Sequence, residues 1–145
     1  MIKNIENKIT KNLQRYNLVN FFRFFSSIIE PKKIIIFSIL LYKFGYTNKK
    51  QIVNYILGII TIIIIKNIIK RKRPFKKNTD IINYDDQYFD EYSFPSGHSF
   101  TAFYFSFMLS CNIQNIYLKN ILIISSSIIA LSRVYLGVHY LSDVT

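Results

Sequence analysis

Long apolar runs, separated by short polar and mostly basic segments, set the pattern of this chain. The clearest run covers residues 51–69 and includes four consecutive isoleucines before Lys66. Other runs cover residues 34–46, 95–112 and 121–136. They lack the alternation of half-buried strands, and the longest reach about the 20 residues with which a helix crosses a bilayer. Because helices satisfy their own backbone in lipid, the pattern predicts an all-α, multi-pass membrane bundle.

We expect residues 1–145 to form a single membrane domain whose first part is less regular. Apolar residues recur at helical spacing in residues 1–15, which predicts an amphipathic surface helix. Residues 16–29 are aromatic-rich but contain Arg23, so they form either a marginal span or a helix in the membrane interface. If they cross the membrane, the N-terminus and the end of the 51–69 run lie on opposite sides.

The segments that join the later runs are polar. Residues 75–93 form a loop that contains five acidic residues, and residues 112–120 are expected to form a short polar hairpin. The single cysteine, Cys111, has no intrachain partner for a disulfide, and we expect it to pack within its apolar run.

The net charge of +11 could indicate either nucleic acid or a membrane as a partner. The basic residues flank apolar runs and do not form a patch with turn residues, as a nucleic-acid surface would. We therefore interpret the charge as membrane flanks plus an anion site, and we expect membrane lipids, and no nucleic acid, as partners. Counting basic residues on the two sides does not decide the orientation in the membrane.

The first candidate cluster is Lys66 and Arg73, followed by Pro74. Seven residues are almost two helical turns, so the two cations would share one face of a helix that ends before the proline. Two cations at a helix end suit a phosphate group. The alternative is that they are ordinary basic residues at the edge of a membrane span.

The second cluster is the sequence Pro95-Ser96-Gly97-His98. At a helix start, free backbone N–H groups and the positive end of the helix dipole face an anion. His98 lies where it could give a proton to a bound group. The alternative is a simple capped helix start with a histidine in the membrane interface.

The third cluster is Arg133, His139 and Asp143, at the end of the last apolar run. On a helix, residues four apart share a face, so Asp143 could hold one ring nitrogen of His139 and leave the other bare for attack. Gly137 would allow the break that brings Arg133 and His139 together. The alternative is an arginine that reaches toward water and a His–Asp pair that stabilises a helix.

Together these clusters read K-x6-R-P, P-S-G-H and S-R-x5-H-x3-D, with all eleven defined positions filled. This pattern resembles the type 2 phosphatidic acid phosphatase superfamily, which also includes undecaprenyl pyrophosphate phosphatases and vanadium haloperoxidases. The resemblance covers residues 51–145. It implies that family's helical membrane bundle, with the last helix truncated, because only Val144 and Thr145 follow Asp143.

The resemblance also implies roles for the clustered residues. His139 would attack phosphorus and form a phosphohistidine, Asp143 would orient its ring, and His98 would protonate the leaving group and then activate water. The phosphoryl oxygens would be held by Lys66, Arg73, Ser96, Gly97 and Arg133. Three cations would take the place of a metal ion, so neither a metal nor a cofactor is expected.

These roles imply a membrane phosphatase that acts on a lipid phosphate or a polyprenyl pyrophosphate, with its active site on the lumenal or extracellular side. Two alternatives have the same motifs. One is a non-catalytic or degenerate membrane member of the family, and the other is a vanadium-dependent haloperoxidase, which the apolar spans disfavour. Nothing in the sequence indicates an oligomeric state.

Overall fold

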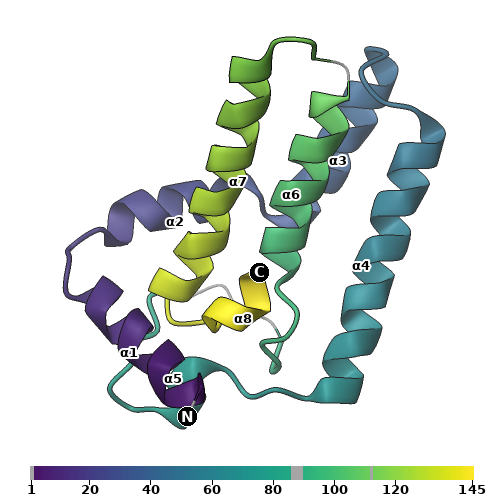
Figure 1. The fold of residues 1–145 in the computed structure, drawn as a ribbon. Helices are drawn as coiled ribbons and strands as arrows, with labels where there is room; N and C mark the ends of the chain where they lie inside the picture. Colours follow the sequence, from purple (N-terminus) through teal and green to yellow (C-terminus); the bar gives the residue numbers. More distant parts are fainter. Residues whose placement is uncertain (1, 86–89, 112) are drawn as a thin grey trace.

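The computed structural model describes residues 2–85, 90–111 and 113–145, and within them the chain is all-α (Figure 1). The all-α prediction is therefore confirmed. The helices of the described residues are α1 (Ile2–Gln14), α2 (Val19–Ile28), α3 (Pro31–Lys43), α4 (Lys49–Ile69), α5 (Pro74–Lys77), α6 (Gly97–Ser110), α7 (Ile116–Tyr135) and α8 (Leu141–Val144).

Two of these helices, α4 and α7, are long and apolar enough to cross a bilayer. Large hydrophobic side chains of α4 remain exposed along much of its length, including Ile56, Ile60, Ile63 and Ile64. In a soluble protein such a surface would favour aggregation, whereas in a bilayer it faces lipid tails. Asn48 begins α4 with a capping box, in which its side chain and that of Gln51 bond each other's backbone N–H.

The helices α6 and α7 lie side by side, and α4 packs against α6 on the other side (Figure 1). The α4–α6 crossing is built from aromatic residues: Tyr55 stacks on Phe100 with ring centroids 6.0 Å apart. Gly58 faces the same ring, and an added Cβ there would lie 2.2 Å from Phe100 Cζ. A small residue at this position therefore lets the two helices approach closely.

The structure decides how the aromatic segment at residues 16–29 is used. Its helix, α2, has ten residues and is about 15 Å long, half the hydrocarbon thickness of a bilayer. It packs across α7, where the ring centroids of Phe22 and Tyr135 lie 4.5 Å apart. The alternative of a membrane span is therefore wrong for this segment.

As a result, the N-terminal helix α1 lies at the same end of the bundle as the loop that follows α4 (Figure 1). Lys11 forms an ion pair with Asp80 in this loop, and Gln14 Nε2 donates to the carbonyls of Ile82 and Tyr135. The N-terminal helix and the end of α4 therefore lie on the same side, whereas a membrane span at residues 16–29 would have put them on opposite sides.

Two local expectations are corrected. Of the polar hairpin predicted at residues 112–120, Asn112 lies outside the described residues, and residues 116–120 are helical. The reason is that α7 begins at Ile116, where Asn115 caps it by accepting the N–H groups of Tyr117 and Leu118. Cys111, expected to be packed, is exposed after the last residue of α6.

Candidate active site

The end of α4 places the first pair of cations, but not in the predicted way. Lys70 adopts a left-handed conformation (φ 50°) that ends the helix, and Pro74 keeps Arg73 extended. Arg73 is therefore not on the helix face of Lys66. The two side chains still meet, because both bind the same carboxylate, with Lys66 Nζ 3.0 Å from Asp90 Oδ2 and Arg73 paired with the other oxygen.

The end of α7 turns back on itself, as predicted from its glycine. Gly137 has φ +79°, and the N–H groups of Val138 and His139 both donate to the carbonyl of Arg133, at 3.3 and 3.2 Å. This turn brings His139 back over the last turn of α7. An added Cβ on Gly137 would lie 2.3 Å from the carbonyl oxygen of Ile82, so only glycine fits.

His139 and Asp143 do approach each other, but not along one helix. His139 precedes the start of α8, and Asp143 is in its first turn, where Oδ2 accepts the backbone N–H of Tyr140 at 2.8 Å. The same oxygen lies 3.6 Å from His139 Nδ1, beyond hydrogen-bond distance. The two side chains therefore approach each other across the start of α8, and not as two residues four apart within one helix.

The imidazole of His139 lies beside a cation, and its side chain is only 3% exposed. Its Nε2 lies 3.5 Å from Arg73 Nη1, which also donates to the carbonyl of Val138 at 2.8 Å. Burial, followed by the charges of Arg73, Arg133 and Lys66, holds the pKa of His139 well below its usual value. The ring is therefore neutral near pH 7, with a lone pair available on one nitrogen.

The start of α6 joins this cluster through the backbone. The N–H of Ser96 donates to the carbonyl of Asp143 at 2.9 Å, and its side-chain oxygen caps α6 by accepting the N–H of Ser99. His98, in the first turn, is near enough for the charges of Arg133, Arg73 and Lys66 to act on it. An added Cβ on Gly97 would meet no atom within 4 Å, so space is open beside the first N–H groups of the helix.

Two acidic residues of the loop before α6 form ion pairs with the cations of the site. Arg133, buried in the last turn of α7, binds Asp85 and the hydroxyl of Ser26, and Asp90 binds Lys66 and Arg73. Burial alone would raise the pKa of Asp90, but the charges of Arg73 and Lys66 hold it below its usual value. The sequence alone indicates no role for the acids of this loop, because their partners are distant along the chain.

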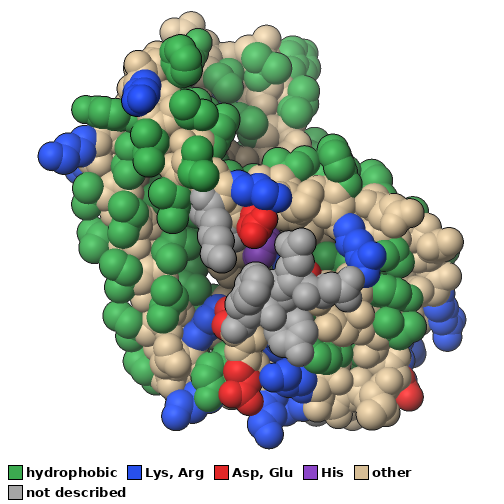
Figure 2. Space-filling model, turned by 180° about the vertical axis from the view of Figure 1, so that it is seen from behind, with side chains coloured by type: hydrophobic (Ala, Val, Ile, Leu, Met, Phe, Trp, Pro, Cys, Tyr) green, Lys and Arg blue, Asp and Glu red, His purple; other side chains and the backbone are tan. Residues whose placement is uncertain are grey.

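The three predicted clusters thus lie together at one end of the bundle. Figure 2 shows a histidine side chain at the bottom of a hollow, with basic and acidic side chains around it and a hydrophobic surface beside it. The candidate residues that gather here are Lys66, Arg73, Ser96, Gly97, His98, Arg133, His139 and Asp143.

This fold and site define a class: a helical membrane protein with a histidine and a set of cations gathered at one end of its bundle. The sequence model of the PAP2 superfamily matches residues 49–145. The chain therefore belongs to the PAP2 superfamily, and the resemblance drawn from the three motifs is confirmed.

Two solved structures share the fold. One is a transmembrane PAP2-type phosphatidylglycerolphosphate phosphatase from Bacillus subtilis, with a TM-score of 0.81 and 18% identity, covering 99% of this chain and 77% of that protein. The other is LpxE from Aquifex aeolicus, with a TM-score of 0.76 and 25% identity, covering 94% of this chain and 84% of that protein. Together with α4 and α7, these likenesses identify a membrane protein.

Proposed function

We propose that this chain is a metal-independent membrane phosphatase that hydrolyses a lipid phosphate or pyrophosphate through a phosphohistidine. The observation that carries the proposal is the position of the buried His139 ring beside Arg73, with Lys66 and Arg133, from other parts of the chain, near enough for their charges to act on it. A neutral imidazole is a nucleophile, and several cations around it stabilise the charge of a transferring phosphoryl group.

His139 would attack through Nε2, because Nδ1 is the nitrogen on the side of Asp143. A bond forms between Nε2 and phosphorus while the bond from phosphorus to the leaving oxygen breaks, and His98 gives that oxygen a proton. Asp143 stabilises the positive charge that develops on the ring. In the second half, His98 takes a proton from water, the water oxygen bonds to phosphorus, and the phosphohistidine bond breaks.

Lys66, Arg73 and Arg133 would hold the phosphoryl oxygens, together with the N–H of Gly97 and the hydroxyl of Ser96. The cap of α6 uses the Ser96 oxygen as an acceptor, so its own proton remains suited to a phosphoryl oxygen. Across the described residues, no three His, Cys, Asp or Glu side chains are grouped as metal ligands.

A lipid substrate fits the surroundings of these residues. The exposed isoleucines of α4 continue past Lys66 to Ile68 and Ile69, so a lipid tail could lie against them while its phosphate enters the site. The Bacillus subtilis neighbour, by its name, acts on phosphatidylglycerolphosphate. We propose the same broad substrate class, a phosphate or pyrophosphate on a lipid or polyprenyl tail.

Phosphate release by the purified chain in detergent tests the proposal. We expect release from at least one member of a panel of phosphatidate, phosphatidylglycerolphosphate and polyprenyl pyrophosphate, unchanged by EDTA and inhibited by vanadate. Because the cations belong to the protein, chelation should remove nothing that the reaction needs. Absence of release from the whole panel by folded protein would favour the non-catalytic alternative, and loss of release in EDTA would contradict the metal-independent mechanism.

Asp90 must leave Lys66 and Arg73 before a phosphoryl group binds them. We expect Asp90→Asn to bind vanadate about 3- to 10-fold more tightly, which corresponds to about 1 kcal/mol for a competing ion pair that is half-exposed on the acid's side. Since the pKa of Asp90 is lowered, the wild-type carboxylate competes at neutral pH and ceases to compete only as the pH falls through that lowered value.

Asp80→Asn is the matched control, because Asp80 is an exposed loop acid paired with Lys11. It should leave vanadate inhibition unchanged. Equal inhibition of wild type and Asp90→Asn would show that Asp90 does not compete with the anion.

The membrane orientation can be measured with Cys111, the single cysteine. It follows the last residue of α6, about 20 Å along the helix from the site end. We propose that the site faces the lumen or exterior. Basic residues usually favour the cytoplasmic side, and we propose that those around the site instead attract anionic lipid. A membrane-impermeant maleimide should then label Cys111 only after intact cells are permeabilised. Labelling before permeabilisation would place the site in the cytoplasm.

A further inference from the structure

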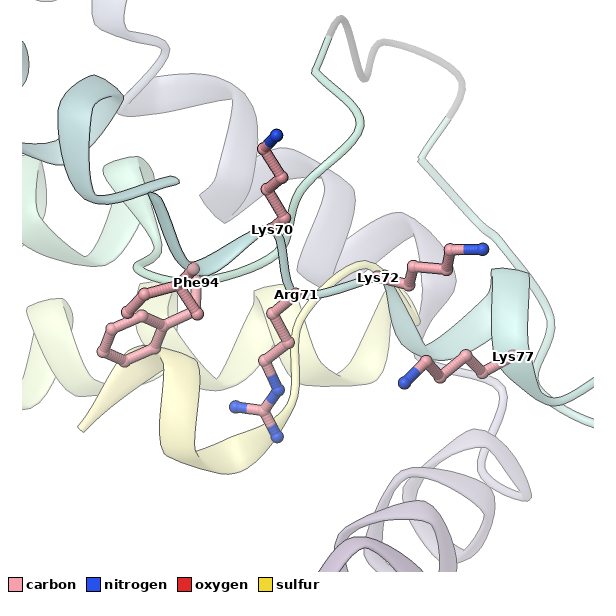
Figure 3. Close-up of a pocket in the computed structure, with 6 residues that line it drawn as sticks. Lys70, Arg71, Lys72, Lys77 and Phe94 are labelled. Atoms are coloured by element: carbon pink, nitrogen blue, oxygen red, sulfur yellow. The ribbon is translucent and has the colours of Figure 1, made fainter. Parts of the chain in front are cut away.

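Arg71 occupies an undefined position of the first motif, between Lys66 and Arg73, and its side chain points into the fold. Lys70, Arg71, Lys72, Lys77 and Phe94 line a pocket of about 710 Å³ beside the end of α4. Figure 3 shows the guanidinium of Arg71 directed toward α8, away from the amino groups of Lys70 and Lys72. The side chain of Arg71 is only 18% exposed, whereas Lys70, Lys72 and Lys77 are exposed.

The guanidinium of Arg71 reaches three groups of the α8 region. Its Nη1 donates to Asp143 Oδ1 at 2.5 Å and to Ser142 Oγ at 2.8 Å. Its plane lies over the ring of Tyr140, with Cζ 4.1 Å from the ring centroid. Charge-assisted bonds from a planar guanidinium fix both the position and the direction of their partner.

The other side of the guanidinium is held by the N-terminal helix. Arg71 Nη2 donates to Glu6 Oε2 at 2.9 Å. Glu6 Oε1 accepts both the N–H and the hydroxyl of Ser142, at 2.9 and 2.6 Å. Glu6 is 5% exposed, so this carboxylate is buried with partners on both oxygens. Such a satisfied, buried ion pair makes the local arrangement rigid.

These contacts end at the carboxylate that faces the nucleophile of the proposed function. One oxygen of Asp143 is held by Arg71, and the other accepts the N–H of Tyr140 and faces His139 Nδ1. We propose that Arg71, held in place by Glu6 of α1, is a positioning residue that fixes the Asp143 carboxylate and thereby the orientation of the His139 ring. This proposal rests on the proposed function, because it assigns Arg71 a part in that reaction without contact to the substrate.

The proposal predicts a change in pH dependence as well as in rate. Burial raises the pKa of Asp143, while the Tyr140 N–H and the charge of Arg71 oppose that rise. The other groups near this carboxylate are His139, Lys66, the Tyr140 hydroxyl and Ser93, and Glu6 lies on the far side of Arg71. Without the charge of Arg71, the pKa of Asp143 rises further, so Asp143 becomes protonated at a higher pH and the acid limb of kcat/KM moves upward.

Arg71→Gln, Arg71→Lys and Glu6→Gln, compared with Lys72→Gln, test the proposal. Lys72 is adjacent and lines the same pocket but is exposed, so Lys72→Gln should match wild type within about 2-fold. We expect Arg71→Gln to lower kcat about 10- to 100-fold with KM changed less than about 3-fold, and to move the acid limb to higher pH. Arg71→Lys should restore part of both, and Glu6→Gln should lower kcat about 5-fold.

Three results would overturn the proposal. The first is that Arg71→Gln behaves like Lys72→Gln. The second is an increase in KM with unchanged kcat, which indicates a phosphate ligand, and the third is a loss of activity with no change in the pH profile, which indicates a purely structural role. These outcomes are separate from failure of the proposed function, in which the wild-type chain itself releases no phosphate.

A second measurement does not need turnover. The chain has two histidines, so ¹⁵N-histidine NMR in detergent, assigned with His98→Gln, reports the tautomer and titration of His139 directly. Arg71→Gln should change both, and Lys72→Gln neither. Unchanged His139 signals in Arg71→Gln would overturn the proposal even if no substrate were found.

Discussion

Replacing His139 with alanine is expected to lower phosphate release by about 10⁴-fold or more. The reason is that the variant lacks the atom that bonds to phosphorus, so no neighbouring group can take over the covalent step. His139 is buried beside Arg73, and its position comes from the turn at Gly137, so the variant should keep the bundle. Initial rates of phosphate release, with folding checked by thermal unfolding in detergent, provide the measurement.

His98→Ala is the informative comparison, because the two histidines act in different halves of the reaction. With an activated aryl phosphate, whose leaving group needs no proton, His98→Ala should still form the phosphohistidine but hydrolyse it slowly. The labelled intermediate should therefore accumulate in His98→Ala and be absent in His139→Ala. Substantial phosphate release by His139→Ala, or label on that variant, would contradict the assignment of the nucleophile.

The second large effect is expected at Gly137. Alanine there must adopt φ near +79° and would place its Cβ 2.3 Å from the backbone oxygen of Ile82. The left-handed conformation costs about 1–2 kcal/mol, and the backbone contact cannot be relieved by rotating a side chain. We expect Gly137→Ala to lose about 3 kcal/mol or more of stability, and to lose at least about 100-fold in activity because the turn that carries His139 must shift.

Gly45→Ala separates the two causes. Gly45 has nearly the same conformation, φ +76°, but an added Cβ there would meet no atom within 4 Å. Its variant should therefore show the conformational cost alone, about 1–2 kcal/mol, with normal activity. Equal destabilisation of the two variants in thermal unfolding would show that the contact with Ile82 is relieved at little cost.

The interactions of Asp85, Asp90, Glu6 and Arg71 were not predictable from the sequence. Each pairs with a group farther along the chain than a few helical turns. The pairs are Asp85 with Arg133, Asp90 with Lys66, Glu6 with Arg71, and Arg71 with Asp143. Periodicity and motif spacing report on neighbours within a few turns, and a charged loop residue looks solvated until its partner is known. The ion pairs of the loop acids, and the contact between Glu6 of α1 and Arg71, are therefore visible only in the folded structure.

Some errors had local causes that the sequence did contain. The seven-residue spacing predicts Arg73 on the helix of Lys66, but the residue before a proline avoids helical geometry, and the chain leaves α4 at Lys70. The polar residues of 112–120 predict a hairpin and a helix that begins at residue 121, whereas the cap at Asn115 starts α7 five residues earlier.

The sequence by itself determined that the chain forms apolar helices, that Gly137 breaks the last of them, and which three clusters carry the motifs of the PAP2 superfamily. These properties depend on hydrophobic periodicity, backbone restrictions and residue identity, which act locally. Only the tertiary structure decided that α2 packs across α7 without crossing a bilayer, that α1 reaches the site, and that loop carboxylates bind the cations. Those outcomes depend on which distant surfaces and charges come into contact, because electrostatic and packing energies act through space and not along the chain.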